Sequence, residues 1–169
     1  RLVVDLNRSR DLPEAVPAVA FGLAVPANAD LDERARRRRL RALHDPYRRS
    51  LRAEVRRAIR RRGEVVHLSV HAFTGTLGEE RRAFDVGLLF DPARPREQAV
   101  VDELSRALRE EGMDVRENQP YLGTEDGGTT WLRTIFPDPV YAGLELELRD
   151  DLPAERVAGV RRVVLRWAR

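Results

Sequence analysis

His71–Asp91, HAFTGTLGEERRAFDVGLLFD, is the stretch around which the rest of the chain is organised. The apolar run at 65–70 precedes it and predicts a buried strand that delivers His71 to its end, and residues 84–90 predict a second apolar strand. A turn rich in threonine and glycine and a pair of arginines lie between the two strands. An imidazole at a strand end that faces an arginine suits a metal or an anionic substrate, and a structural histidine is the alternative.

Length and composition predict one soluble globular domain over residues 1–169, since 42% of the residues are hydrophobic and 35% are charged. The chain has no cysteine, which excludes disulfides and thiolate metal sites, so a metal would have to use histidine and carboxylates. No apolar run approaches the roughly 20 residues of a membrane span. We therefore expect a cytoplasmic protein without a membrane partner. Because Arg1 leads directly into an apolar run, we also expect the domain to be truncated at its N-terminus.

The basic charge is local. All 31 basic residues are arginine and the net charge is only +3, but residues 30–62 hold fourteen arginines against five acidic residues, a local charge of +9. Such a face is typical of a solvated helix, and an RNA-binding module is the alternative. The segment contains a single aromatic residue, Tyr47, that could stack on a base. We therefore expect nucleic acid to be an unlikely partner.

In the first part of the chain, residues 1–6 predict a strand, and residues 9–29, with three prolines, predict an extended surface loop. A helix is expected from a cap at Asn28 or Asp30 to Leu43. His44–Pro46 is interpreted as a break, with Asp45 capping a second helix that ends at Gly63. The expected buried stripe of this second helix is Leu51, Val55 and Ile59.

Beyond Gly63, apolar strands alternate with helices. Strands are expected at 65–70, 84–90, 113–116 and 140–148, and helices at 95–111, 130–135 and 153–169. The last helix is expected to bury Val157, Val160, Val164 and Trp167. This alternation predicts an α/β fold of three layers, αβα, with a central mixed sheet.

Polar residues cluster where the predicted strands end. Asn7 and Arg8 follow the first strand, His71 ends the second, Asn118 follows a later one, and Glu145 and Glu147 lie in the last strand. In open α/β sheets, functional residues gather at the carboxyl ends of strands. Glu145 and Glu147 share one face of an apolar strand, where carboxylates are costly to bury unless they are paired or functional. A solvated strand face and a surface-loop arginine are the alternatives.

Four stretches together carry a resemblance. DLNRS at 5–9, the stretch at 71–91, ENQPYLGTEDGGTTWLR at 117–133 and GLELELRDDL at 143–152 resemble the N-formylglutamate amidohydrolase family in order and spacing. That family is similar to zinc carboxypeptidases and to aspartoacylase-like enzymes. The resemblance implies a phosphorylase/hydrolase-like fold and zinc-dependent hydrolysis of an N-acyl amino acid, such as N-formylglutamate, to the free amino acid and a carboxylate.

The same resemblance implies roles for individual residues. The family's first metal motif would precede Arg1, so His71 is the one expected zinc ligand in this chain, and metal affinity is expected to be weak. Glu147 is expected to be the general base, with Glu145 as the alternative. The implied substrate-binding residues are Asn7, Arg8, Arg82, Asn118 and Tyr121.

We therefore expect His71, Glu147, Asn7 and Arg8 to converge on one cleft. A non-catalytic domain that binds a small carboxylate is the alternative function. Self-association is a further expectation, because a strand beginning at Leu2 would present an unpaired edge.

Overall fold

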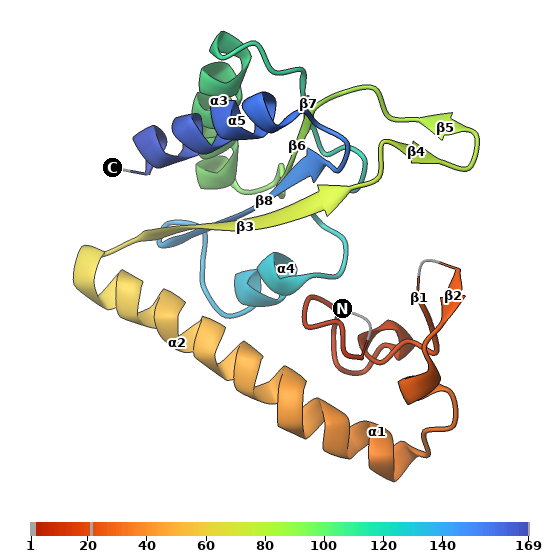
Figure 1. Cartoon of the computed structure of the whole chain (residues 1–169). Coiled ribbons are helices and arrows are strands. Elements are labelled where there is room, and N and C mark those ends of the chain that lie inside the picture. Colours follow the sequence, from red (N-terminus) through yellow and green to blue (C-terminus); the bar gives the residue numbers. More distant parts are fainter. Residues whose placement is uncertain (1–2, 21, 169) are drawn as a thin grey trace.

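The computed structural model describes residues 3–20 and 22–168 and has a three-layer α/β architecture (Figure 1). Its central sheet has four strands in the order β3 (Val65–Phe73), β8 (Tyr141–Arg149), β6 (Val86–Leu89) and β7 (Val115–Glu117). The pairs β3–β8 and β6–β7 are parallel, whereas β6 and β8 are antiparallel. The sheet is therefore mixed, and the predicted fold class is confirmed.

One face of the sheet packs against α3 (Pro95–Glu110) and α5 (Ala154–Trp167), as Figure 1 shows. Apolar side chains of all four strands and both helices meet there and form the largest hydrophobic core. The last helix buries Val160 and Val163, whereas Val157 is 40% exposed, so its predicted inward position was wrong. The buried members of this core are Val86, Leu88, Phe90, Val101, Leu104, Leu108, Met113, Val115, Ala142, Leu144, Leu146, Val160 and Val163.

The other face is covered by α2 (Asp45–Arg62) and the short α4 (Gly128–Arg133) (Figure 1). The predicted stripe of α2 is confirmed, because Leu51, Val55 and Ile59 pack in one cluster with Leu132 and Tyr141. Gly63 ends α2 in the left-handed conformation, at φ 81°, which glycine adopts without steric cost.

The predicted break between two helices at His44–Pro46 was wrong. A π-helical turn, η3 (Leu40–His44), joins α1 (Glu33–Arg39) to α2, and the backbone of Asp45 is helical. Proline lacks the amide that would bond the preceding turn, and the wider π turn accommodates this loss without ending the helix. Asp32 caps α1 by accepting a hydrogen bond from the amide of Ala35 at 2.6 Å, in place of the predicted Asn28 or Asp30.

The predicted first strand is not formed in the described residues 3–6, and Leu2 lies outside the described part of the chain. Val4 is buried instead in a small core with Ala15, Val16 and Leu40. Val4 therefore packs against residues of later turns and not into the sheet.

Residues 9–20 and 22–29 contain more regular structure than the predicted loop. They contain the turns η1 (Pro13–Ala15) and η2 (Pro26–Asn28) and the paired strands β1 (Val19–Ala20) and β2 (Leu23–Ala24). A second hairpin, β4 (Thr76–Leu77) with β5 (Glu80–Arg81), connects β3 to β6. None of the helices in the described residues is long and apolar enough to cross a membrane.

Candidate active site

Two acidic side chains project from the sheet face opposite the main core. Along β8, Leu144 and Leu146 enter that core, so the alternating Glu145 and Glu147 point to the side of α2 and α4. The parallel register pairs Glu147 with His71 of β3 and Glu145 with Ser69. The period of two along neighbouring strands therefore gathers a histidine, a serine and two glutamates on one patch of the sheet.

Within this patch, Glu145 is held by protein groups on both oxygens. The hydroxyl of Thr129 in α4 donates to its Oε1 at 2.8 Å, and Nε2 of His71 lies 3.7 Å from its Oε2. Nε2 of His71 is also 2.9 Å from the hydroxyl of Ser69. Glu147 is 6% exposed. Glu145 is thus oriented by its neighbours, and both carboxylates are shielded from bulk water.

The segment at residues 5–9 crosses in front of this patch. Oδ1 of Asn7 accepts the amide of Gly128 at 2.7 Å, at the start of α4. Arg8 donates to the carbonyl of Asp126 at 2.8 Å, and the carboxylate of Asp126 accepts both the amide and the hydroxyl of Ser9. These bonds fasten Asn7 and Arg8 to the loop that leads into α4, although more than 110 positions separate them in the sequence.

Two side chains of the continuous helix hold the same segment from the other side. Nε of Arg48 donates to the carbonyl of Leu6 at 3.0 Å, and its Nη2 donates to the carbonyls of Asn7 and Arg8 at 2.8 and 3.0 Å. Nε2 of His44 lies 2.9 Å from the carbonyl of Arg8. Burial lowers the pKa of Arg48, while distant carboxylates raise it. The two residues position the backbone that carries Asn7 and Arg8.

Replacing Arg48 by methionine is expected to lower the free energy of unfolding by about 2–4 kcal/mol, because three carbonyls lose their donor in a buried place. Urea denaturation followed by circular dichroism measures the change. Arg49→Met is the matched control, since Arg49 is an exposed neighbour on the same helix. Equal loss from both variants would contradict the positioning role of Arg48.

The loop after β7 brings Tyr121 to the site, whereas Asn118 at the start of this loop and Arg82, which precedes β6, do not line it. Oδ1 of Asn118 accepts the amides of Phe90 and Gly123 at 3.0 and 2.9 Å, so this side chain shapes the loop. Nη2 of Arg82 pairs with Oε2 of Glu80 at 3.0 Å. Cζ of Arg82 lies over the Tyr121 ring, 5.4 Å from the ring centroid. The hydrogen bond to Glu80 raises the pKa of Arg82, with a smaller contribution from Tyr121.

A cavity of about 250 Å³ opens between the sheet, the segment at residues 5–9 and this loop. It brings together Asn7, Arg8, Tyr121 and Glu147 of the predicted residues, with Glu145 beside them. His71, Asn118 and Arg82 do not line the cavity, and His71 lies behind it, next to Glu145 on the sheet. The polar and charged lining residues are Asp5, Asn7, Arg8, Thr74, Tyr121, Glu125, Asp126, Glu145 and Glu147.

Comparison with known proteins places this arrangement in a family. Residues 1–153 match the family model of N-formylglutamate amidohydrolase. The chain belongs to the N-formylglutamate amidohydrolase family. No curated protein matches the sequence of the chain.

Two solved structures are similar to this member of the N-formylglutamate amidohydrolase family. A gene product of Agrobacterium tumefaciens is 27% identical with a TM-score of 0.75, and the match covers 99% of this chain and 65% of that chain. The N-formylglutamate amidohydrolase of Ralstonia eutropha is 22% identical with a TM-score of 0.68, covering 98% and 70%. The chain thus spans about two thirds of the length of these structures.

The zinc ion that the sequence resemblance implies would need a set of protein ligands. A catalytic zinc ion takes three protein ligands and keeps one position open for water. Among residues 3–20 and 22–168, no group of three or more histidines and carboxylates could hold a metal ion. His71 and Glu145 come together only as a pair. The described residues therefore do not fit a complete zinc site of this kind.

A second histidine of the same strand, His67, is partly buried. Nδ1 of His67 lies 2.9 Å from the hydroxyl of Tyr141. Burial lowers the pKa of His67 below its ordinary 6.5. Glu145 raises this pKa, and His71 lowers it further. Burial likewise raises the pKa of the Tyr141 phenol. The folded state thus favours neutral forms of both groups.

His67 predicts a pH dependence of stability. As pH falls below 6.5, His67 protonates in the unfolded chain before it does so in the folded chain, so the folded state loses stability until pH reaches its lowered pKa. We expect the free energy of unfolding, measured by urea at pH 7.5 and 5.5, to fall less in His67→Gln than in the wild type. An equal fall in both proteins would contradict this assignment.

Sequence reasoning missed Arg48, His44, Thr129 and Asp126. A signal existed for Arg48, because it continues the buried stripe of Leu51 and Val55 toward the start of the helix, where a charged residue is unusual. Thr129 and Asp126 lie in a stretch rich in glycine and threonine that carries no periodic pattern. Only their contacts reveal what they hold.

Proposed function

We propose that this chain hydrolyses the amide bond of a small N-acyl amino acid such as N-formylglutamate. One observation carries the proposal. Glu147, Arg8 and Asn7 line a single cavity in a chain that belongs to the N-formylglutamate amidohydrolase family. A carboxylate base, an arginine fork and an amide are the groups that such a reaction needs at one place.

The charges on the lining suggest how the substrate would lie. Arg8 is the one cation among several carboxylates of the lining, and a guanidinium can bind a carboxylate with two hydrogen bonds. Among the described residues, Nδ2 of Asn7 has no hydrogen-bond partner, so it can donate to the same carboxylate. The substrate carboxylate would therefore lie at Arg8 and Asn7, and the uncharged acyl group would point to Glu147.

In this orientation the chemistry is amide hydrolysis with Glu147 as general base. Glu147 takes a proton from a water molecule while the oxygen of that water bonds to the acyl carbon. The tetrahedral intermediate then releases the amine. Glu147 returns the proton to the leaving nitrogen, so the products are the free amino acid and a carboxylate, which is formate for a formyl substrate. Glu145 would then act through its hydrogen bond to Thr129 and its contact with His71, which orient the patch.

Zinc dependence stays a prediction of the resemblance. His71 with Glu145 supplies two ligands at most, so a zinc ion bound to this chain alone is expected to be held weakly. Zinc content after dialysis against micromolar zinc tests this directly. One tightly held equivalent per chain that is lost in His71→Ala would contradict the expected weakness and support a metal role for His71.

The second candidate is a domain that binds a small carboxylate without turning it over. The incomplete metal site favours this second candidate. His71 and Glu145 supply two ligands at most, whereas hydrolysis of the zinc carboxypeptidase kind uses three. This reading shares the binding role of Arg8 and Asn7 with the first proposal and differs from it only in the chemical step.

One experiment separates the two functions. The purified chain is incubated with N-formyl-L-glutamate, with and without zinc, while formate and glutamate are measured by NMR and binding is measured by calorimetry. Release of both products in equal amounts supports hydrolysis. Binding that Arg8→Gln abolishes, without product, supports the second candidate. Neither binding nor product under both conditions would overturn both functions.

A further inference from the structure

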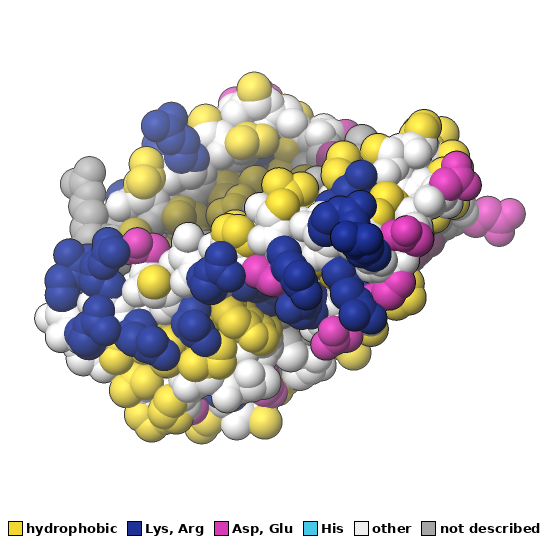
Figure 2. All heavy atoms as spheres, turned by 90° about the horizontal axis from the view of Figure 1, so that it is seen from below, with side chains coloured by type: hydrophobic (Ala, Val, Ile, Leu, Met, Phe, Trp, Pro, Cys, Tyr) yellow, Lys and Arg dark blue, Asp and Glu magenta, His cyan; other side chains and the backbone are white. Residues whose placement is uncertain are grey.

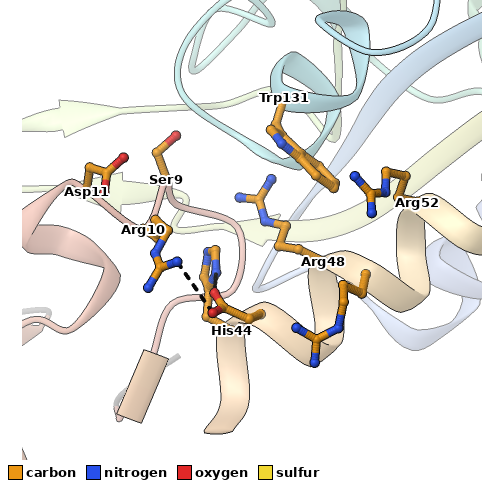
Figure 3. A pocket seen from close by; sticks show the side chains of 9 residues that line it. Ser9, Arg10, Asp11, His44, Arg48, Arg52 and Trp131 are labelled. Carbon is orange, nitrogen blue, oxygen red and sulfur yellow. Dashed lines mark ion pairs between the residues drawn. The ribbon is translucent and has the colours of Figure 1, made fainter. Parts of the chain in front are cut away.

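A second cavity, of about 390 Å³, lies between residues 9–11, helix α2 and Trp131 of α4 (Figure 3). It shares no lining residue with the cavity that holds Glu147. Its volume is in the range of small-molecule sites. Four of its nine lining side chains are the arginines Arg10, Arg48, Arg49 and Arg52.

Arg48 is the buried cation of this cavity. It is 6% exposed, and its guanidinium lies over the Trp131 ring, with Cζ 4.9 Å from the ring centroid. Its hydrogen-bond partners are the backbone carbonyls of residues 6–8, and no carboxylate of the described chain lies within ion-pair distance. Backbone carbonyls and more distant carboxylates stabilise this charge, but no carboxylate pairs with it directly, so Arg48 contributes a positive potential to the cavity.

Two further arginines add to this potential. Figure 3 shows Arg52 on the same helix as Arg48, next to Trp131, and Arg49 also lines the cavity. In the part of the chain that the structure describes, neither Arg49 nor Arg52 forms a hydrogen bond or ion pair through its side chain. Arg10 differs, because Asp45 neutralises it at 3.4 Å. Three of the four arginines that line the cavity thus form no ion pair with a described carboxylate, although Asp11 is also among the lining residues.

We propose that this cavity binds a small phosphorylated compound, with the phosphate held by Arg48, Arg49 and Arg52. A phosphate carries close to two negative charges and accepts paired hydrogen bonds from guanidinium groups, which suits three cations better than a single carboxylate would. The organic part of the ligand would lie toward Trp131. This site is separate from the proposed hydrolysis and does not depend on it.

The shape of the surface favours a small ligand over a long polyanion. Figure 2 shows arginines in a band over the face of α1 and α2, interrupted by acidic and hydrophobic side chains. Such a band binds nucleic acid diffusely, through exposed charge. The cavity differs because Arg48 is buried within it and cannot reach the backbone of a nucleic acid that lies on the outer face.

The test uses calorimetry at about 150 mM salt, a concentration at which exposed charges are largely screened, with three probes: adenosine 5′-monophosphate, inorganic phosphate and adenosine. We expect the monophosphate to bind one site per chain, phosphate to bind more weakly, and adenosine not to bind. Arg52→Gln is expected to weaken monophosphate binding about tenfold, since charge-assisted hydrogen bonds are lost. Arg61→Gln, an exposed arginine of the same helix outside the cavity, is expected to leave binding unchanged.

Three results would overturn the proposal: adenosine binding as tightly as its monophosphate, no binding of either phosphate probe at millimolar concentration, or equal weakening by Arg61→Gln and Arg52→Gln. The last result would show diffuse binding to the helix face. If circular dichroism shows that Arg52→Gln does not fold, Arg49→Gln decides instead, because Arg49 is exposed and its replacement disturbs no packing.

Discussion

Replacing Glu147 by glutamine is expected to lower the rate of N-formylglutamate hydrolysis by about 10²–10⁴-fold, the range that a positioned general base contributes. Glutamine keeps the shape of the side chain but cannot take a proton from water. Substrate binding should persist, because Arg8 and Asn7 remain. The rate constant kcat should therefore fall much more than the Michaelis constant changes, which initial rates of formate release would measure.

Comparison with Glu145→Gln shows which of the two carboxylates is the general base. Both carboxylates point from β8 into the same cavity, but the oxygens of Glu145 already face Thr129 and His71. We expect Glu145→Gln to reduce activity less than Glu147→Gln does, and Glu54→Gln, an exposed glutamate of α2, to have no effect. If Glu145→Gln were the inactive variant and Glu147→Gln stayed active, the base would be Glu145.

Replacing Glu97 by alanine is expected to cost about 3–5 kcal/mol of folding free energy, the usual loss when one partner of a buried ion pair is removed. Glu97 is fully buried and binds Arg133 through two hydrogen bonds, at 2.9 and 2.8 Å. Arg94 lies 3.1 Å from the same carboxylate. Glu97 also accepts the amides of Asp91 and Gly143.

This carboxylate therefore joins α3, α4 and β8 at one point. Its removal would leave the buried guanidinium of Arg133 without a carboxylate and two amides without an acceptor. Arg94 would keep its ion pair with Asp138, at 3.6 Å. Because a domain of this kind has about 5–15 kcal/mol of stability in all, the variant should be close to unfolding. Urea denaturation followed by tryptophan fluorescence measures the loss.

Glu33→Ala is the matched control for this prediction. Glu33 also pairs with an arginine, Arg37, at 2.7 Å, but both side chains are about 60% exposed. Solvent screens such a pair, so only a small change in stability is expected. If the two glutamate variants were equally stable, the buried network would not contribute to the junction of α3, α4 and β8.

The layers of the fold followed from local pattern. Apolar residues with a period of two marked β3 and β8, and apolar residues three and four apart marked α2, α3 and α5. Prediction was poorest before Glu33, where short elements and prolines carry no sustained period. There, Val4 reached a buried position through contacts with Ala15 and Leu40 that no local pattern contains.

Several residues of the candidate site were selected from the sequence for a similar reason. Glu145 and Glu147 share a face because of strand geometry alone, and the motif at 5–9 singled out Asn7 and Arg8. Asn118 was misplaced, because its side chain turns back to the amides of Phe90 and Gly123. A motif specifies which residue occupies a position but not which neighbours satisfy its hydrogen bonds.

By itself, the sequence determined the long strands and helices after Gly63 and most of their apolar faces, because these properties depend on spacings of two to four residues. Only the tertiary structure decided that Arg48 holds Asn7 and Arg8, that Glu97 joins three elements, and that a second cavity is lined by arginines. Each of these features depends on side chains that lie far apart in the chain. Their energies come from burial, which exists only once the layers have packed.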